Sequence, residues 1–149
     1  MSQTLTIPPL ESMICFSVYS AGLAFNRLYR GLLEHCGLTY PQFLVLVALR
    51  QQNNRKVSDL GEALFLESNT LTPLLKRMEQ AGLIARRRAS KDERAVIVSL
   101  TEKGARLTLD LGCVPPDVAQ ATRLDLGEIT ALTARLNTLS KALREHVAH

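Results

Sequence analysis

The sequence has no tryptophan, few aromatic residues of any kind (5%) and only three cysteines among 149 residues. Its longest apolar stretch, Phe43 to Leu49, is far too short to span a bilayer, and the N-terminus lacks the basic segment and apolar run of a signal peptide. No like-charge block or low-complexity run is present, so disorder is not expected in the body of the chain. We therefore expect one cytoplasmic domain in which Cys15, Cys36 and Cys113 are reduced thiols and not a disulfide framework.

Several kinds of chemical site are also missing. The histidines, His35, His146 and His149, lie at helix or chain ends with no Cys/His ligand spacing, so no metal site is expected. The sequence contains no glycine-rich phosphate loop, no nucleophile elbow and no paired-carboxylate signature. We therefore expect a protein that is not an enzyme and carries no cofactor.

The positive charge is concentrated in one segment. The formal net charge is only +4, but the segment from Lys76 to Arg94 holds seven bases and three acids, which accounts for all of it. The other 130 residues hold 11 bases and 11 acids. A local excess of this kind is typical of a phosphate-binding surface, and the alternative is a solvated charged hairpin with no partner.

The N-terminal part of the chain predicts two helices. Apolar residues at spacings of four and three from Ile14 to Leu32 indicate a long helix over roughly Glu11 to Glu34, ended by Cys36-Gly37. After Thr39-Tyr40-Pro41, where proline is acceptable in a first turn, the run Phe43 to Arg50 predicts a buried helix. The polar residues 51–56 are predicted to form a loop.

The middle of the chain predicts a winged helix-turn-helix. Ser58 can cap a short helix over Ser58 to Leu66, and a second helix is expected from Asn69 or Thr70 to about Ala81, with Pro73 in its first turn. The segments 83–88 and 95–100 flank a polar tip, and the second is rich in β-branched residues, so they predict a hairpin that serves as the wing.

The C-terminal part predicts two more helices separated by a break. Thr101 can cap a helix to about Gly112, Pro115-Pro116 is expected to break the chain, and a last helix covers roughly Asp125 to Val147. Its apolar seam would be exposed on a lone chain. The predicted fold is mainly α with a small β-hairpin wing, in which residues 11–36 and 101–147 form dimerisation helices and residues 40–100 form a winged helix-turn-helix DNA-binding lobe.

Candidate DNA contacts lie on the second helix of the motif and on the wing. In a winged helix-turn-helix the second helix enters the major groove and the wing reaches the adjacent minor groove. Any of the four polar residues that begin this helix can instead serve as its cap, and Asp92 can shape the wing tip by pairing with Arg94 or another base. The candidates are Ser68, Asn69, Thr70, Thr72, Lys76, Arg77, Arg86, Arg88, Lys91, Asp92 and Arg94.

Three segments resemble a known family. They are LTYPQFLVLVAL at residues 38–49, TLTPLLKRMEQAGLIARRR at residues 70–88 and DERAVIVSLTEKG at residues 92–104. They closely resemble the MarR family of dimeric winged-helix repressors, and the chain is most similar to its organic-hydroperoxide-sensing, OhrR-type branch. The resemblance implies a homodimer that binds a pseudo-palindromic double-stranded operator, with an organic hydroperoxide as effector.

The N-terminal segment ICFSVYSAGLAFNRLYR, residues 14–30, resembles the sensing helix of that branch, and Cys15 occupies the position of its peroxidatic cysteine. A cysteine in the first turn of a helix is favoured as the reactive thiolate by unpaired N–H groups and the helix dipole. Tyr19 is one turn away, while Tyr29 is about 21 Å along the helix and needs an antiparallel partner chain to meet Cys15. The resemblance implies that Tyr29 and Tyr40 approach Cys15 across the dimer interface. The alternative is that Cys15 is a small buried core residue.

The other cysteines do not follow the two-cysteine pattern of the branch. Aligning on Val114-Pro115 places Gln120 where some members carry a resolving cysteine, and Cys113 lies seven residues earlier. A Cys15–Cys113 disulfide is therefore less expected than a mixed disulfide with a low-molecular-weight thiol or further oxidation of Cys15. Cys36 is expected to be a packing residue. A repressor that responds to a small phenolic or other non-oxidant ligand, and a thiol peroxidase, remain as alternative functions.

Overall fold

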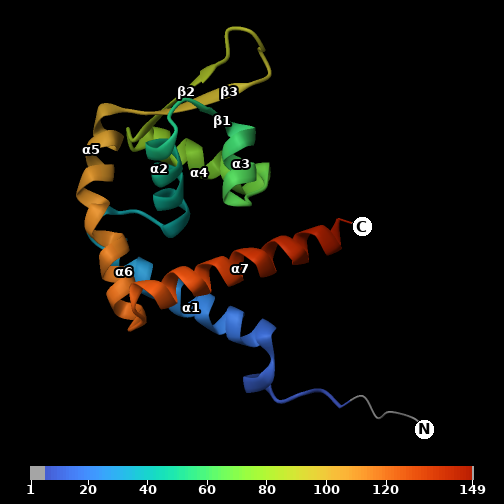
Figure 1. The fold of residues 1–149 in the computed structure, drawn as a ribbon. Coiled ribbons are helices and arrows are strands. Elements are labelled where there is room, and N and C mark those ends of the chain that lie inside the picture. The colour runs from blue at the N-terminus through green and yellow to red at the C-terminus, as the bar shows by residue number, and fades with distance from the viewer. Residues whose placement is uncertain (1–5, 149) are drawn as a thin grey trace. The chain divides into compact units, whose positions relative to one another are not determined.

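A computed structural model describes residues 6–148, and the chain divides after Asp110 into two compact units. The fold is mainly helical with one small antiparallel sheet, as the sequence predicts (Figure 1). The helices are α1 Ile14–Leu33, α2 Tyr40–Gln51, α3 Val57–Leu64, α4 Ser68–Gln80, α5 Glu102–Asp110, α6 Val114–Thr122 and α7 Leu126–Val147. The strands are β1 Arg55–Lys56, β2 Ile84–Arg88 and β3 Val96–Leu100, and 3₁₀ helices cover Leu10–Ser12, Glu34–Cys36 and Leu111–Cys113.

The first unit begins with α1, which starts three residues later than predicted because a 3₁₀ turn precedes it. The following 3₁₀ turn ends at Gly37, whose φ of 65° lies in the left-handed region that glycine tolerates. Within α1 only Leu33 is buried, so its apolar seam is exposed on the single chain. This exposure agrees with the pattern that predicts pairing between subunits.

Helix α2 forms the centre of the core. Thr39 and Gln42 make a reciprocal capping box at its start, with Pro41 in the first turn, which explains why α2 begins before the predicted Phe43. Its buried side chains are Phe43, Val45, Leu46, Ala48 and Leu49. The apolar run that is too short for a membrane span is therefore a core helix.

The sheet has the order β1-β3-β2, with both pairs antiparallel. The β2–β3 hairpin is the predicted wing, and the helices of the motif pack beneath its base (Figure 1). Val98 of β3 is fully buried opposite Arg86. The prediction of a loop over residues 51–56 is wrong at its end, because Arg55–Lys56 pairs with β3 as β1. The turn before β1 is held by Asn53, whose Oδ1 accepts a hydrogen bond from the Leu100 N–H at 3.0 Å.

The helix-turn-helix is confirmed, but two local predictions within it are wrong. Ser58 does not cap α3, because the helix starts at Val57 and Lys56 occupies the cap position without a side-chain hydrogen bond. Pro73 is not in the first turn of α4, because that helix already begins at Ser68. The proline removes only the N–H that would bond the Asn69 carbonyl, while four apolar side chains hold the helix against the core.

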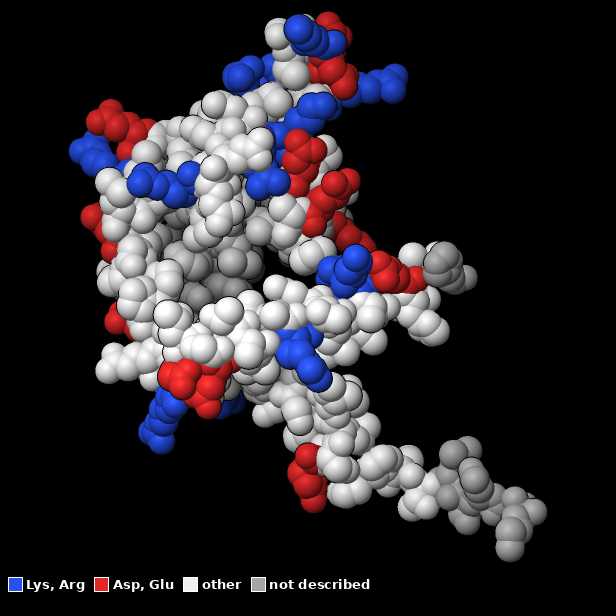
Figure 2. Space-filling model, viewed as in Figure 1, with Lys and Arg blue, Asp and Glu red and all other residues white. Residues whose placement is uncertain are grey.

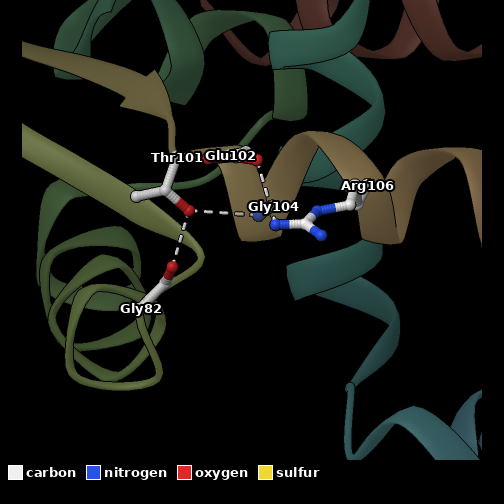
Figure 3. A network of polar contacts seen from close by, with 5 residues as sticks. All are labelled: Gly82, Thr101, Glu102, Gly104 and Arg106. Atoms are coloured by element: carbon white, nitrogen blue, oxygen red, sulfur yellow. Dashed lines mark hydrogen bonds and ion pairs between the residues drawn. The ribbon is translucent and has the colours of Figure 1, made fainter.

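The wing root is tied to the end of α4 by the polar network of Figure 3. The Thr101 hydroxyl donates to the Gly82 carbonyl at 2.6 Å and accepts from the Gly104 N–H at 3.1 Å, so Thr101 caps α5 as predicted. Gly104 is needed here, because a Cβ at that position would lie 2.0 Å from the Leu83 carbonyl oxygen. An ion pair between Glu102 and Arg106, at 3.1 Å, lies on the exposed side of the same helix.

The second unit contains α6 and α7. The expected break at Pro115-Pro116 is wrong, because both prolines lie in the first turn of α6, where a missing N–H costs no helical hydrogen bond. Asp125 and Glu128 form a capping box that starts α7, within one residue of the predicted helix. No residue of α7 is buried, and Leu132, Leu136 and Leu143 are exposed on the single chain.

None of the helices in residues 6–148 is by itself both long and apolar enough to cross a membrane. One pair, Ile14–Cys36 with Tyr40–Gln51, meets the length and composition criteria together, but it bends by 74°.

Candidate functional site

The predicted DNA contacts form one exposed surface on α4 and the wing. Ten of the eleven candidates are exposed, and only Arg86 is half-buried. Basic side chains surround the hairpin at the top of Figure 2, with acidic side chains among them. The basic residues that are concentrated in one segment of the sequence therefore lie mostly exposed around the wing.

Helix α4 has one apolar and one polar face. Leu71, Leu74, Leu75 and Met78 are buried, whereas Ser68, Thr72 and Lys76 follow one another at intervals of four on the outside. Glu67 is the N-cap residue, so none of the four polar candidates occupies that position. Thr70 donates a long hydrogen bond to the Asn69 side chain, at 3.4 Å. The start of α4 thus exposes hydroxyl and amide groups.

Arg86 has a structural contact that the sequence does not reveal. Its Nε donates to Oε2 of Glu79 at 2.6 Å, which joins the wing strand β2 to α4. In the sequence, Glu79 is visible only as one of three acids in a basic segment. The sequence signal that could have predicted this contact is the opposite charge of Glu79 and Arg86 on either side of the turn at Gly82. Glu79 is therefore a candidate positioning residue for Arg86.

The wing tip is shaped by Asp92. Its Oδ1 accepts a hydrogen bond from the Arg94 N–H at 3.0 Å, and its carbonyl accepts one from the Ala95 N–H at 3.0 Å. The guanidinium of Arg88 lies 3.5 Å from the Glu93 carbonyl oxygen. Asp92 acts on the backbone of the tip, while the side chains of Lys91 and Arg94 are exposed.

Cys15 lies in the first turn of α1, as predicted, and is exposed on the single chain. On the single chain, Cys15 is therefore not a buried core residue. Tyr19, one turn further on, is 61% exposed and packs beside Phe16, with ring centroids 6.3 Å apart. Tyr29 belongs to the same uninterrupted helix, so about 21 Å of helical rise separates it from Cys15 within one chain.

The other two candidate tyrosines, Tyr29 and Tyr40, pack against each other. The rings of Tyr29 and Tyr40 have centroids 4.2 Å apart, and Phe43 lies 5.6 Å from Tyr29. Burial raises the pKa of both phenols, and the neighbouring Tyr40 raises the pKa of Tyr29 further. Both groups therefore remain protonated O–H donors at neutral pH. The structure brings these two together, and it leaves Cys15 and Tyr19 at the other end of α1.

The remaining cysteines, Cys36 and Cys113, each end a short 3₁₀ helix. Cys36 Sγ lies 3.2 Å from Nε2 of His35, and Cys113 is exposed in the second unit. No disulfide joins any of the three within residues 6–148. Gln120 lies in α6. His149 lies outside the described residues, and those residues contain no cluster of three or more metal-ligating side chains.

Comparisons with known proteins agree with this architecture. The family model of the SarA/Rot transcriptional regulators matches residues 27–111. The chain is 46% identical to the HTH-type transcriptional regulator TtmR of Methylorubrum extorquens over 145 residues, covering 96% of this chain and 74% of that protein. It is 39% identical to the organic hydroperoxide resistance transcriptional regulator of Bacillus subtilis over 136 residues, covering 91% and 92% of the two chains.

A solved structure extends the likeness to the fold. The structure of reduced AbfR bound to DNA has a TM-score of 0.75 and 34% sequence identity, covering 90% of this chain and 93% of that one. Sequence, fold and the exposed basic surface thus point to the same class of protein. This chain belongs to the SarA/Rot and MarR-type family of winged-helix DNA-binding transcriptional regulators.

Proposed function

We propose that this regulator is a redox-sensing repressor, which leaves its operator when organic hydroperoxides oxidise Cys15. The observation that carries the proposal is the exposed position of Cys15 in the first turn of α1. It is supported by the 39% identity to a Bacillus subtilis regulator of organic hydroperoxide resistance. The relatives are named as regulators, and the proposal assigns no catalytic turnover to Cys15.

The chemical step is a two-electron oxidation of the thiolate. Cys15 S⁻ attacks the outer oxygen of the hydroperoxide, the O–O bond breaks, and the leaving alkoxide takes a proton to become an alcohol. The product is a Cys15 sulfenic acid. A low-molecular-weight thiol then condenses with it, giving a mixed disulfide and water, or further peroxide oxidises it. The same condensation gives a Cys15–Cys113 disulfide and water if the Cys113 thiol meets the Cys15 sulfenic acid, but Cys113 departs from the expected spacing.

The proposed homodimer explains the exposed apolar faces of α1 and α7. Phe16, Leu23 and Phe25 are between 37% and 44% exposed, and Leu132 and Leu136 are 49% and 42% exposed. Apolar rows on two long helices are what a self-complementary interface would cover. We assign residues 11–36 and 101–147 to that interface. An antiparallel α1 of the partner would bring its Tyr29 and Tyr40 O–H groups to Cys15.

The proposed DNA complex uses α4 in the major groove and the wing in the adjacent minor groove, with residues 40–100 as the DNA-binding lobe. Two lobes related by a twofold axis require a pseudo-palindromic operator with half-sites about one helical turn apart. Oxidation changes the size and hydrogen bonding of Cys15 beside the interface. This shifts the dimer toward a state with a different lobe spacing, in which the two α4 helices no longer fit one duplex.

The test is a DNA-binding titration on an operator selected from a library of random duplexes with the reduced protein. Cumene hydroperoxide is expected to release the wild type and to leave Cys15→Ser bound, while Cys36→Ser and Cys113→Ser serve as matched thiol controls. If Cys15→Ser is released to the same extent as the wild type, the sensor assignment is wrong. Release of Cys15→Ser by a phenolic acid, with no effect of peroxide on either protein, would indicate a small-ligand repressor. Repeated peroxide turnover would indicate a thiol peroxidase.

A further inference from the structure

A hollow of about 250 Å³ lies between α4 and the wing. Its walls come from β1, the start of α3, the middle of α4, strand β2, the end of the wing tip and the start of β3. The lining residues are Lys56, Val57, Ser58, Thr72, Leu75, Arg86, Arg94, Ala95 and Val96. Lys56 and Ser58 are absent from the set of DNA contacts predicted from the sequence, since they lie outside the second helix of the motif and outside the wing.

The charge around the hollow is of one sign. Lys56, Arg86 and Arg94 come from three different segments, and among the described residues that line the hollow none is acidic. Glu79, which does not line the hollow, forms an ion pair with Arg86 and so offsets one of the three positive charges. Like charges gathered beside a low-dielectric core repel one another, so an anion placed among them lowers the electrostatic energy.

Donors are available around the hollow. The Arg86 guanidinium carries five N–H groups, and its bond to Glu79 uses the Nε–H. The contact between Asp92 and Arg94 uses the backbone N–H of Arg94 and not its guanidinium. Ser58 is the second residue of α3 and does not occupy its cap position, and Thr72 lies on the exposed polar face of α4. Hydroxyl and guanidinium donors together suit a phosphate oxygen.

We propose that this hollow seats one backbone phosphate of bound DNA, with Lys56 and Ser58 as contacts. The inference rests on the proposed placement of α4 in the major groove and the wing in the minor groove. A sugar–phosphate backbone separates those two grooves, so a lobe that occupies both must straddle one strand. The hollow lies between the two elements that enter the grooves, which is where that strand passes.

The experiment measures how duplex binding depends on potassium chloride concentration, with the selected operator and with a random duplex of equal length. The slope of log affinity against log salt falls by about 0.9 for each phosphate contact that is lost. Lys56→Gln is expected to lower the slope by about that amount per lobe on both duplexes, because the contact reads no base. Ser58→Ala is expected to weaken binding severalfold with an unchanged slope, since it removes a neutral donor. Arg50→Gln, at the exposed end of α2 and outside both the predicted contacts and the proposed interface, is the charge-matched control and keeps the wild-type slope.

The outcomes separate this inference from the proposed function. If the wild type binds DNA and Lys56→Gln has the same slope of log affinity against log salt, the hollow does not bind a backbone phosphate. The repressor proposal is then unaffected. Failure of the reduced wild type to bind any duplex overturns both. A free-anion site is distinguished by replacing chloride with inorganic phosphate at equal ionic strength. If phosphate inhibits the wild type but not Lys56→Gln, while their slopes in chloride are equal, the hollow takes free phosphate and the proposal is wrong. Circular dichroism melts check that both variants keep the wild-type fold.

Discussion

Arg86 and Glu79 join the wing to the helix that precedes it. The Nε of Arg86 lies 2.6 Å from Oε2 of Glu79, and the two side chains are 28% and 39% exposed. In the proposed DNA complex α4 and the wing must keep a constant separation, and this ion pair connects the two elements directly. The Thr101 network at the root of the wing adds a second connection (Figure 3).

We expect the Glu79–Arg86 pair to contribute modestly to stability. Both side chains are partly solvated, so solvent screening limits the coupling to about 0.5–1 kcal/mol. A double-mutant cycle with Glu79→Ala, Arg86→Ala and the double variant measures it by urea unfolding at one protein concentration. A coupling energy of zero within error would mean that the pair does not hold the wing to α4.

Gly104→Ala is expected to be strongly destabilising. The added Cβ would lie 2.0 Å from the Leu83 carbonyl oxygen, so the backbone of the wing root must move. Overpacking typically costs about 1–3 kcal/mol, and a contact with backbone this short places Gly104→Ala at the upper end of that range. Gly112→Ala is the control, because a Cβ there meets no atom within 4 Å. Urea unfolding of both variants tests the difference, and equal stabilities would contradict it.

The sequence predicts elements well where periodicity and turn chemistry agree. The wing follows from the β-branched run AVIVSL, and α7 from its seam of leucines and the Asp125 start. Strand β1 has only two residues, too few to show an alternation, and it exists because Asn53 and β3 hold it. Proline position was the other weak point, since Pro115 and Pro116 begin a helix as readily as they end one.

The sequence predicted most residues of the candidate site, but not how the fold brings them together. The basic segment locates the exposed surface, but Lys56 and Ser58 reach the hollow beside it only through the pairing of β1 with β3. The contact between Glu79 and Arg86 likewise depends on how β2 folds back on α4. Tyr29 and Tyr40 were linked through a family resemblance, whereas their direct ring contact is a tertiary feature of α1 against α2.

Arg94→Ala is expected to weaken binding to operator and random duplexes alike and to lower the salt slope by about 0.9 per lobe. The physical reason is the exposed position of Arg94 at the wing tip, where its charge faces solvent. Arg50→Ala, an exposed position at the end of α2, is the control for the change in net charge. An unchanged slope for Arg94→Ala would remove this residue from the contact set.

The tyrosine pair is expected to make stability depend on pH in the alkaline range. The folded chain raises the pKa of Tyr29 and Tyr40 above the ordinary value, so it binds protons more tightly than the unfolded chain. Below the unfolded pKa of about 10, the two tyrosines make their full contribution to the free energy of unfolding. This contribution is lost as the pH rises through the pKa values of the folded chain. Urea unfolding between neutral and alkaline pH is expected to show this loss in the wild type. The double variant Tyr29→Phe, Tyr40→Phe should lose less stability over that range, and an identical pH dependence would contradict the prediction.

The same phenols are expected to accelerate oxidation of Cys15 in the proposed dimer. A hydrogen bond to a charged group contributes about 1.5–3 kcal/mol, so losing one donor to the thiolate should slow the reaction roughly tenfold or more. The measurement is the second-order rate of Cys15 thiol loss with cumene hydroperoxide, in variants that retain Cys15 alone among the three cysteines. Tyr29→Phe and Tyr40→Phe are each expected to lower the rate, and mixing Tyr29→Phe chains with Cys15→Ser chains tests whether the donor comes from the partner. In such a heterodimer the intact cysteine belongs to the chain that lacks Tyr29 and faces an intact Tyr29 on its partner. A wild-type rate is expected there, and a slow rate would place the donor in the same chain.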